Sequence, residues 1–216
     1  MNIISHRGWS EGEGENTLSA FQKSANAQIA GIEFDIRQNS NGEVIVSHDA
    51  SKPETLLFKD ALSFLKTTNL QLFIELKEPK RDLLATALSS IENASVTQPV
   101  TLFGHKENVT ALFPFTHRAI QSGIIARYPW QITQFINRYK PDFLLTGFDQ
   151  RPWTRVAFRL YWSIFSLKNL LQKHPKTKFI IGVANNASDI RWLSKQKGLY
   201  GITTDNPLLA NSLVNS

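Results

Sequence analysis

The chain has 216 residues, of which 42% are apolar and 19% are charged, and its 24 basic and 18 acidic side chains leave a formal net charge of +6. This composition excludes a disordered chain, a collagen-like repeat and a coiled coil, and the absence of cysteine excludes a disulfide scaffold and thiolate chemistry. No apolar run reaches the roughly 18 residues of a membrane span, and the first residues do not have the pattern of a signal peptide, so we expect a cytoplasmic protein with a single domain over residues 1–216.

Short apolar segments alternate along the chain with longer segments of helical periodicity, which is typical of a parallel sheet whose strands are connected by helices. The predicted strands are Ile3–His6, Ile32–Ile36, Leu72–Leu76, Val100–Phe103, Ala119–Ile124, Phe143–Thr146, Phe179–Val183 and Gly201–Thr204. The predicted helices are Thr17–Ala27, Phe58–Thr67, Arg81–Glu92, Glu107–Phe113, Trp130–Tyr139, Thr154–Leu171, Ser188–Lys197 and Pro207–Val214. Eight strand–helix units predict an α/β fold, a TIM-type (β/α)8 barrel.

One segment after the second predicted strand interrupts this alternation. Asn41-Gly42 is a typical hairpin turn, and Val44–Val46 follows it without an intervening helix. We therefore expect a β-hairpin excursion in which the second strand turns back antiparallel to itself. If the turn is centred on Asn41, the numbers of paired residues sum to about 82, which places His48 beside Phe34.

Four polar patches interrupt the apolar segments, and three of them lie at the ends of predicted strands. The patches are His6-Arg7-Gly8, Glu33-Phe34-Asp35, His48-Asp49 and Glu75-Leu76-Lys77. In a (β/α)8 barrel the active site forms at the C-terminal ends of the strands, and the hairpin returns the His48 patch to the same rim. We therefore expect the four patches to meet at one mouth of the barrel.

Burying a carboxylate in an otherwise apolar strand costs free energy unless the carboxylate is paired or binds a cation. The sequence predicts three such carboxylates, those of Glu33, Asp35 and Glu75. Because side chains alternate along a strand, Glu33 and Asp35 point to the same face. An all-oxygen cluster suits one divalent cation, Ca²⁺ or Mg²⁺, better than zinc. The alternative is a polar rim in which these acids only form ion pairs with nearby Arg and Lys side chains.

His6 and His48 are predicted to act as an acid–base pair, because imidazole transfers protons near neutral pH. Beside a divalent cation, one imidazole would take a proton from the attacking oxygen and the other would protonate the leaving alkoxide of a phosphate ester. Arg7 and Lys77 would hold the phosphate oxygens. His105 ends a strand and could reach the mouth, but we expect no catalytic role for it.

The pattern of these motifs resembles the glycerophosphodiester phosphodiesterase family, one of the PI-PLC-like barrels. The motifs are His6-Arg7-Gly8, Glu15-Asn16-Thr17, Glu33-Phe34-Asp35, His48-Asp49, Glu75-Leu76-Lys77 and Gly201-Ile202-Thr203-Thr204-Asp205-Asn206-Pro207. The resemblance implies a metal-dependent enzyme that hydrolyses glycerophosphodiesters to a phosphomonoester and an alcohol, with water or a neighbouring hydroxyl of the substrate as nucleophile. It implies the acid–base pair His6 and His48, the cation ligands Glu33, Asp35 and Glu75, and the substrate-binding residues Arg7, Glu15, Asn16 and Lys77.

Two features depart from the family pattern. Family members usually carry an inserted cap subdomain after the His-Asp pair, whereas only 25 residues separate Asp49 from Glu75. The family's Trp-Thr-Val-Asn stretch on the seventh strand corresponds to Gly182-Val183-Ala184-Asn185, so an aromatic wall of the pocket is missing. We expect a wider, uncapped pocket that would admit a lysophospholipid-like diester as well as a small glycerophosphodiester.

The predicted helix Thr154–Leu171 carries two apolar stripes within a basic segment, because residues 151–178 contain seven Lys or Arg and no Asp or Glu. The stripe expected to face the barrel is Val156, Leu160, Ile164, Leu167 and Leu171. The stripe expected to face outward is Phe158, Tyr161, Trp162 and Phe165. Peripheral contact with an anionic inner membrane surface, a homodimer contact or cover by a neighbouring segment would each explain an outward apolar stripe.

Two other functions remain open from the sequence. A related barrel of the sphingomyelinase D type would form a cyclic phosphate, and a non-catalytic barrel would bind phosphate or lipid without reaction. Nucleic-acid binding is not expected despite a sequence pI near 9.6, because the basic excess is confined to one predicted helix and the loop after it, without a nucleic-acid-binding motif.

Overall fold

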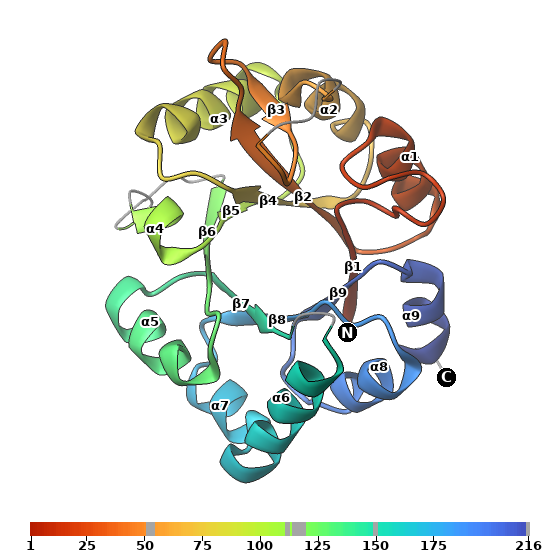
Figure 1. The fold of residues 1–216 in the computed structure, drawn as a ribbon, viewed down its shortest axis with the longest axis vertical. Coiled ribbons are helices and arrows are strands. Elements are labelled where there is room, and N and C mark those ends of the chain that lie inside the picture. Colours follow the sequence, from red (N-terminus) through yellow and green to blue (C-terminus); the bar gives the residue numbers. More distant parts are fainter. Residues whose placement is uncertain (51–54, 111–112, 114–119, 149–150, 215–216) are drawn as a thin grey trace.

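The structure is a computed structural model that describes residues 1–50, 55–110, 113, 120–148 and 151–214. Within these residues eight parallel strands close into a barrel with the helices outside it, which confirms the predicted (β/α)8 fold (Figure 1). The strands are β1 (Asn2–His6), β2 (Gly31–Gln38), β4 (Gln71–Leu76), β5 (Val100–Phe103), β6 (Ile120–Ile125), β7 (Phe143–Gly147), β8 (Lys178–Gly182) and β9 (Gly201–Thr204), with β3 (Val44–Val46) attached outside the ring.

The helices follow the strands in the predicted order. They are α1 (Leu18–Asn26), α2 (Phe58–Leu65), α3 (Arg81–Asn93), α4 (Lys106–Val109), α5 (Ile132–Tyr139), α6 (Pro152–Phe165), α7 (Leu167–Lys173), α8 (Ala187–Ser194) and α9 (Pro207–Val214). The ends of the predicted strands agree with the structure to within two residues, although Ala119, the first residue of one of them, lies outside the described residues. No helix among the described residues combines the length and apolar character needed to cross a bilayer.

The inside of the barrel changes character from one end to the other. It holds a compact apolar cluster of Ile4, Phe73, Phe103, Phe143, Leu145 and Ile180. The rings of Phe73 and Phe143 meet edge to face with their centroids 5.3 Å apart. On β1 and β4 the inward position two residues further along is polar, because Ile4 is followed by His6 and Phe73 by Glu75. The barrel therefore rests on a closed apolar layer and carries its polar groups at the C-terminal end.

The β2–β3 hairpin has the predicted register. Ile36 pairs with Val46, and Gln38 pairs with Val44, so each pair of residue numbers sums to 82. Gly42 occupies the turn with a φ of 81°, a conformation that glycine adopts without strain. The backbone NH of Ser47 then donates to the carbonyl of Asp35 over 3.0 Å, which extends the pairing beyond β3. His48 follows directly and thus lies at the rim beside β2.

The predicted helix Thr154–Leu171 is wrong as a single element, because the structure divides it into α6 and α7. Ser166 takes a φ of 56° and a ψ of 94°, which no α-helix accommodates. The Ser166 side chain accepts a hydrogen bond from the backbone NH of Asn169 over 3.3 Å and so caps the second helix. Leu167 and Leu171 are buried, as predicted, but on α7.

The predicted orientation of the first part of this helix is also wrong. Phe158 and Trp162 are only 4% and 5% exposed, whereas Val156, Leu160 and Ile164 are 61–68% exposed. Phe158 and Trp162 therefore do not offer the outward surface predicted for them. Of their two predicted companions, Tyr161 is half-buried and Phe165 is 60% exposed.

The orientation of α6 has an electrostatic cause that lies on α8. Asp189 is buried, and its carboxylate pairs with Arg155 over 2.7 Å and with Arg159 over 3.4 Å. A buried carboxylate needs such partners, so the two arginines turn toward Asp189, and Phe158 and Trp162 lie on the same inward side of the helix. The smaller aliphatic residues are left facing outward.

Candidate active site

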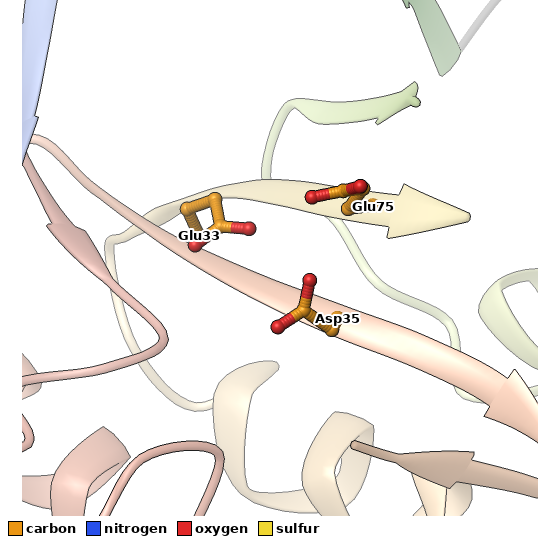
Figure 2. Close-up of side chains that lie close together, drawn as sticks. All are labelled: Glu33, Asp35 and Glu75. Atoms are coloured by element: carbon orange, nitrogen blue, oxygen red, sulfur yellow. The ribbon is translucent and has the colours of Figure 1, made fainter. Parts of the chain in front are cut away.

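Three carboxylates converge at the C-terminal end of the barrel. Glu33 and Asp35 lie on β2, and Glu75 lies on the adjacent β4, where it pairs directly with Asp35 (Figure 2). All three side chains are buried, and one oxygen of each lies within 4.8 Å of the others. The structure therefore brings together the three residues predicted as cation ligands.

The electrostatics of this cluster favour a bound positive charge. Burial, together with the charge of Asp35, raises the pKa of Glu33 to about 8 and that of Glu75 to about 7. Burial alone would also raise the pKa of Asp35, but the charges of Lys77 and Arg7 outweigh it and lower that pKa. Without a cation, two of the three acids therefore tend to hold a proton near neutral pH.

Asp35 is the best-anchored member of the cluster. Its Oδ2 accepts a hydrogen bond from Asn16 over 3.0 Å and lies 3.1 Å from Nε of Arg7. Its Oδ1 is buried and has no hydrogen-bond donor among the described residues, although Lys77 lies 3.4 Å away. An anionic oxygen left without a donor, beside two further carboxylates, fits a divalent cation.

The four residues predicted to bind substrate contact the carboxylate cluster or one another. The backbone NH of Arg7 donates to Glu33 over 2.9 Å, and its guanidinium pairs with Glu15 over 2.7 Å. Lys77 pairs with Glu75 over 2.8 Å. The ion pairs of the alternative interpretation, a purely polar rim, are thus present as well, and they surround a cluster whose burial still favours a cation.

His6 is held by a carboxylate that the sequence analysis did not single out. Its Nδ1 lies 2.7 Å from Asp205, which follows β9 directly, and Asn185 holds Asp205 in turn. Burial alone would lower the pKa of His6, but the hydrogen bond to Asp205 and the charge of Glu33 outweigh it and raise that pKa. Because Nδ1 is engaged, Nε2 is the nitrogen left for chemistry.

The signal that could have identified Asp205 was present in the sequence. Asp205 is a carboxylate at the C-terminal end of a predicted strand, which is the same criterion that selected Glu33 and Glu75. Only its partner was hidden, since β9 and β1 are adjacent in the barrel but lie at opposite ends of the chain.

His48 lies at the edge of the same site. Its Nδ1 is 3.0 Å from the carboxylate of Asp49, and its backbone carbonyl accepts a hydrogen bond from Arg37 over 2.8 Å. Its charge is close enough to help lower the pKa of Asp35. His6 lines the large cavity described next, whereas His48, which follows the β2–β3 hairpin, is not among the residues that line it.

A cavity of about 800 Å³ opens beside the carboxylates. His6, Glu33 and Glu75 form its polar wall, and the opposite side is mainly apolar, with side chains from β5 to β8 and from the loops that follow them. His105 also lines the cavity, and burial together with the charge of Arg127 lowers its pKa. The cavity is much larger than the cluster of charged groups at one end of it.

Comparison with known proteins agrees with this geometry. Residues 6–77 match the model of the "Glycerophosphoryl diester phosphodiesterase family", and this segment contains all nine residues predicted for the site. The chain is 23% identical to mouse Glycerophosphodiester phosphodiesterase 1 over 196 residues, which cover 79% of this chain and 58% of the mouse protein. It is 22% identical to the human protein of that name, covering 71% of this chain and 50% of the human one, so it spans little more than half the length of these relatives.

Two solved structures share the fold over almost their whole length. One is an Oleispira antarctica phosphodiesterase in complex with the product sn-glycerol-3-phosphate, with a TM-score of 0.79, 17% identity and coverage of 100% of this chain and 97% of that one. The other is the glycerophosphodiester phosphodiesterase of Thermotoga maritima, with a TM-score of 0.71, 19% identity and coverage of 99% and 98%. Both structures share the barrel fold, and the family match over residues 6–77 agrees with the resemblance noted in the sequence.

Proposed function

We propose that the chain is a metal-dependent member of the glycerophosphoryl diester phosphodiesterase family and hydrolyses glycerophosphodiesters to a phosphomonoester and an alcohol, which the family match over residues 6–77 supports. The observation that carries this proposal is the buried cluster of Glu33, Asp35 and Glu75 beside His6 at the open end of the barrel. A structural role alone would not favour three buried acids, two of which have raised pKa values.

One divalent cation, Ca²⁺ or Mg²⁺, would be held by Glu33, Asp35 and Glu75. When bound, it supplies positive charge that stabilises the charge developing on the phosphate during the reaction. The donor-free Oδ1 of Asp35 and the all-oxygen donor set support this assignment.

The protons would be moved by His6 and His48. Asp205 fixes the ring of His6 through Nδ1, so Nε2 is the atom that accepts or donates a proton in the cavity. Asp49 holds Nδ1 of His48 in a similar way, which leaves Nε2 of that ring for the second transfer. One imidazole takes a proton from the attacking oxygen, and the other protonates the leaving alkoxide.

Arg7 and Lys77 would bind the phosphate oxygens, and Glu15 and Asn16 would position the first loop. Glu15 holds the guanidinium of Arg7, and Asn16 holds the carboxylate and backbone of Asp35. Gly8 allows this loop to lie close to α1, since a Cβ at this position would come within 2.9 Å of Cβ of Ala20. The first loop therefore couples phosphate binding to the acidic cluster.

The proposal is tested with purified protein and glycerophosphocholine, with Ca²⁺ or Mg²⁺ and with EDTA. We expect cation-dependent release of glycerol 3-phosphate and choline. Phosphorus NMR monitors the phosphate product. A cyclic phosphate product would assign the protein to the sphingomyelinase D type instead. No turnover of any glycerophosphodiester with either cation would contradict the proposed activity.

A further inference from the structure

The cavity has an apolar arm that the proposed reaction does not need. Away from the charged wall the cavity is lined by Leu145, Phe148, Ala157, Phe158 and Tyr161, which we call the apolar arm. A phosphate and a small alcohol require polar contacts, and these residues offer almost none. The arm is suited to a hydrocarbon chain.

The mouth of this arm is formed by exposed aromatic side chains. Trp130, in the short 3-10 helix Pro129–Gln131, is 66% exposed, and Trp153 at the start of α6 is 62% exposed, although both line the cavity. The ring of Tyr128 stacks on that of Trp130 with a centroid distance of 4.7 Å. Exposed tryptophans at the opening of an apolar cavity are typical of a surface that meets another apolar phase.

The outer face of α6, the helix that carries Trp153, is also apolar. Val156, Leu160 and Ile164 follow one another at intervals of four residues, so they share one side of the helix, and each is at least 61% exposed. Phe165, at the end of the helix, is 60% exposed. We call Trp130, Trp153, Val156, Leu160, Ile164 and Phe165 the docking face.

The charges around the docking face are basic. Arg127 and Arg151 are exposed and line the cavity near Trp130 and Trp153, and Lys168 is exposed just beyond Phe165. No acidic residue occurs between positions 151 and 178. Apolar side chains bordered by arginine and lysine complement the interface of an anionic bilayer.

We propose that the docking face binds an anionic membrane surface and that a single-chain phosphodiester lipid passes from the bilayer into the cavity. In this arrangement the phosphate lies at the carboxylate cluster and the hydrocarbon chain in the apolar arm. The substrate part of this inference rests on the proposed function, whereas membrane binding does not.

A bilayer explains the docking face better than a second copy of the chain does. Two copies would bring two basic surfaces together, and a partner seated on Trp130 and Trp153 would cover the mouth of the cavity. A lipid surface matches the charge and supplies a substrate at the same opening.

The test compares the wild-type chain with the triple variant Val156→Ser, Leu160→Ser, Ile164→Ser, whose positions do not line the cavity. Sedimentation with vesicles of phosphatidylcholine, with and without phosphatidylglycerol, should show wild-type binding that requires the anionic lipid and weakens with salt. The triple variant should bind the anionic vesicles at least about tenfold more weakly than the wild type. A matched control is Leu18→Ser with Leu208→Ser, two exposed apolar residues on α1 and α9, which should bind like the wild type.

Activity separates this inference from the proposed function. The triple variant should hydrolyse glycerophosphocholine at the wild-type rate but lysophosphatidylcholine in anionic vesicles at about a tenth of it or less. Equal vesicle binding by the wild type and the triple variant would overturn membrane docking. A wild-type chain that is dimeric in solution, with a triple variant that is monomeric, would also overturn it. Vesicle binding with no hydrolysis of any diester would support docking and overturn the proposed function, and with it the lipid substrate.

Discussion

The two sides of the barrel differ sharply at the same C-terminal end. From β1 to β4 the inward side chains are histidine, glutamate, aspartate and lysine, whereas from β6 to β8 they are Ile125, Leu145, Ile180 and two glycines, Gly147 and Gly182. The first side concentrates charge, and the second offers space and apolar surface. If the proposed function is right, reaction chemistry and substrate shape are carried by separate sectors of one ring, so that either could be altered without the other.

The largest effect is expected from the charged sector. His6→Ala or His48→Ala should lower kcat by about 10²–10⁴-fold, because each removes a proton-transfer group. Steady-state kinetics on glycerophosphocholine measures this, with His174→Ala, a histidine beyond α7, as the matched control. A His48→Ala enzyme with the wild-type rate would remove His48 from the mechanism.

In the apolar sector the expected effect is on stability. Phe158→Ala should lower the free energy of unfolding by about 3–5 kcal/mol, since it empties a buried aromatic site. Leu160→Ala, on the outer side of the same helix, should change it by less than about 0.5 kcal/mol. Urea denaturation measures both changes. A larger loss of stability for Leu160→Ala than for Phe158→Ala would contradict the orientation of α6 described above.

Asp205→Asn should have an intermediate effect, because it keeps the shape of the His6 partner but removes its charge. The pKa of His6, which Asp205 raises, should fall, and kcat should fall by about 10–100-fold. The pH profile distinguishes this from a general structural defect. The limb that reports His6 should move to lower pH, and an unshifted profile would mean that Asp205 does not act through His6.

The smallest effect concerns the acids themselves. Glu33 and Glu75 have pKa values of about 8 and 7 in the folded chain, against an ordinary value of 4.5. Between pH 4.5 and 8 the cation-free folded state therefore holds more protons than the unfolded state, so its stability should fall as pH rises.

A bound divalent cation should offset this loss, so the gain in Tm on adding Ca²⁺ or Mg²⁺ should grow from pH 5.5 to pH 8, by about a few degrees. Thermal denaturation with the cation or with EDTA at each pH measures the gain. Glu33→Gln should flatten the trend. A gain that is largest at low pH would contradict the cation assignment.

Much of the fold and of the charged sector could be predicted from the sequence, because local signals determine them. Strand ends, the Asn41-Gly42 turn and alternation along β2 are short-range features, and they were enough to bring Glu33, Asp35 and Glu75 to one mouth. The register of the hairpin followed from the position of the turn at Asn41, because the numbers of paired residues then sum to 82.

What could not be predicted depends on partners far away in the chain. Helical periodicity identified two apolar stripes on α6, but the choice between them depends on Asp189, a buried acid on α8 that draws Arg155 and Arg159 inward. The role of Asp205 likewise depends on a barrel closing between its last and first strands. The division of the helix at Ser166 has no clear sequence signal, since serine is neither glycine nor proline.

The pairing of Asp35 with Glu75 on neighbouring strands also has a consequence for ion selectivity. Adjacent parallel strands are about 4.8 Å apart, and this spacing is fixed by backbone hydrogen bonds rather than by side-chain choice. The width of the proposed cation site would therefore be tied to the ring of strands itself. The preferred ionic radius would change only if the Glu33 side chain were positioned differently or if Glu and Asp were exchanged at these positions. The spacing of the strands that carry them is fixed.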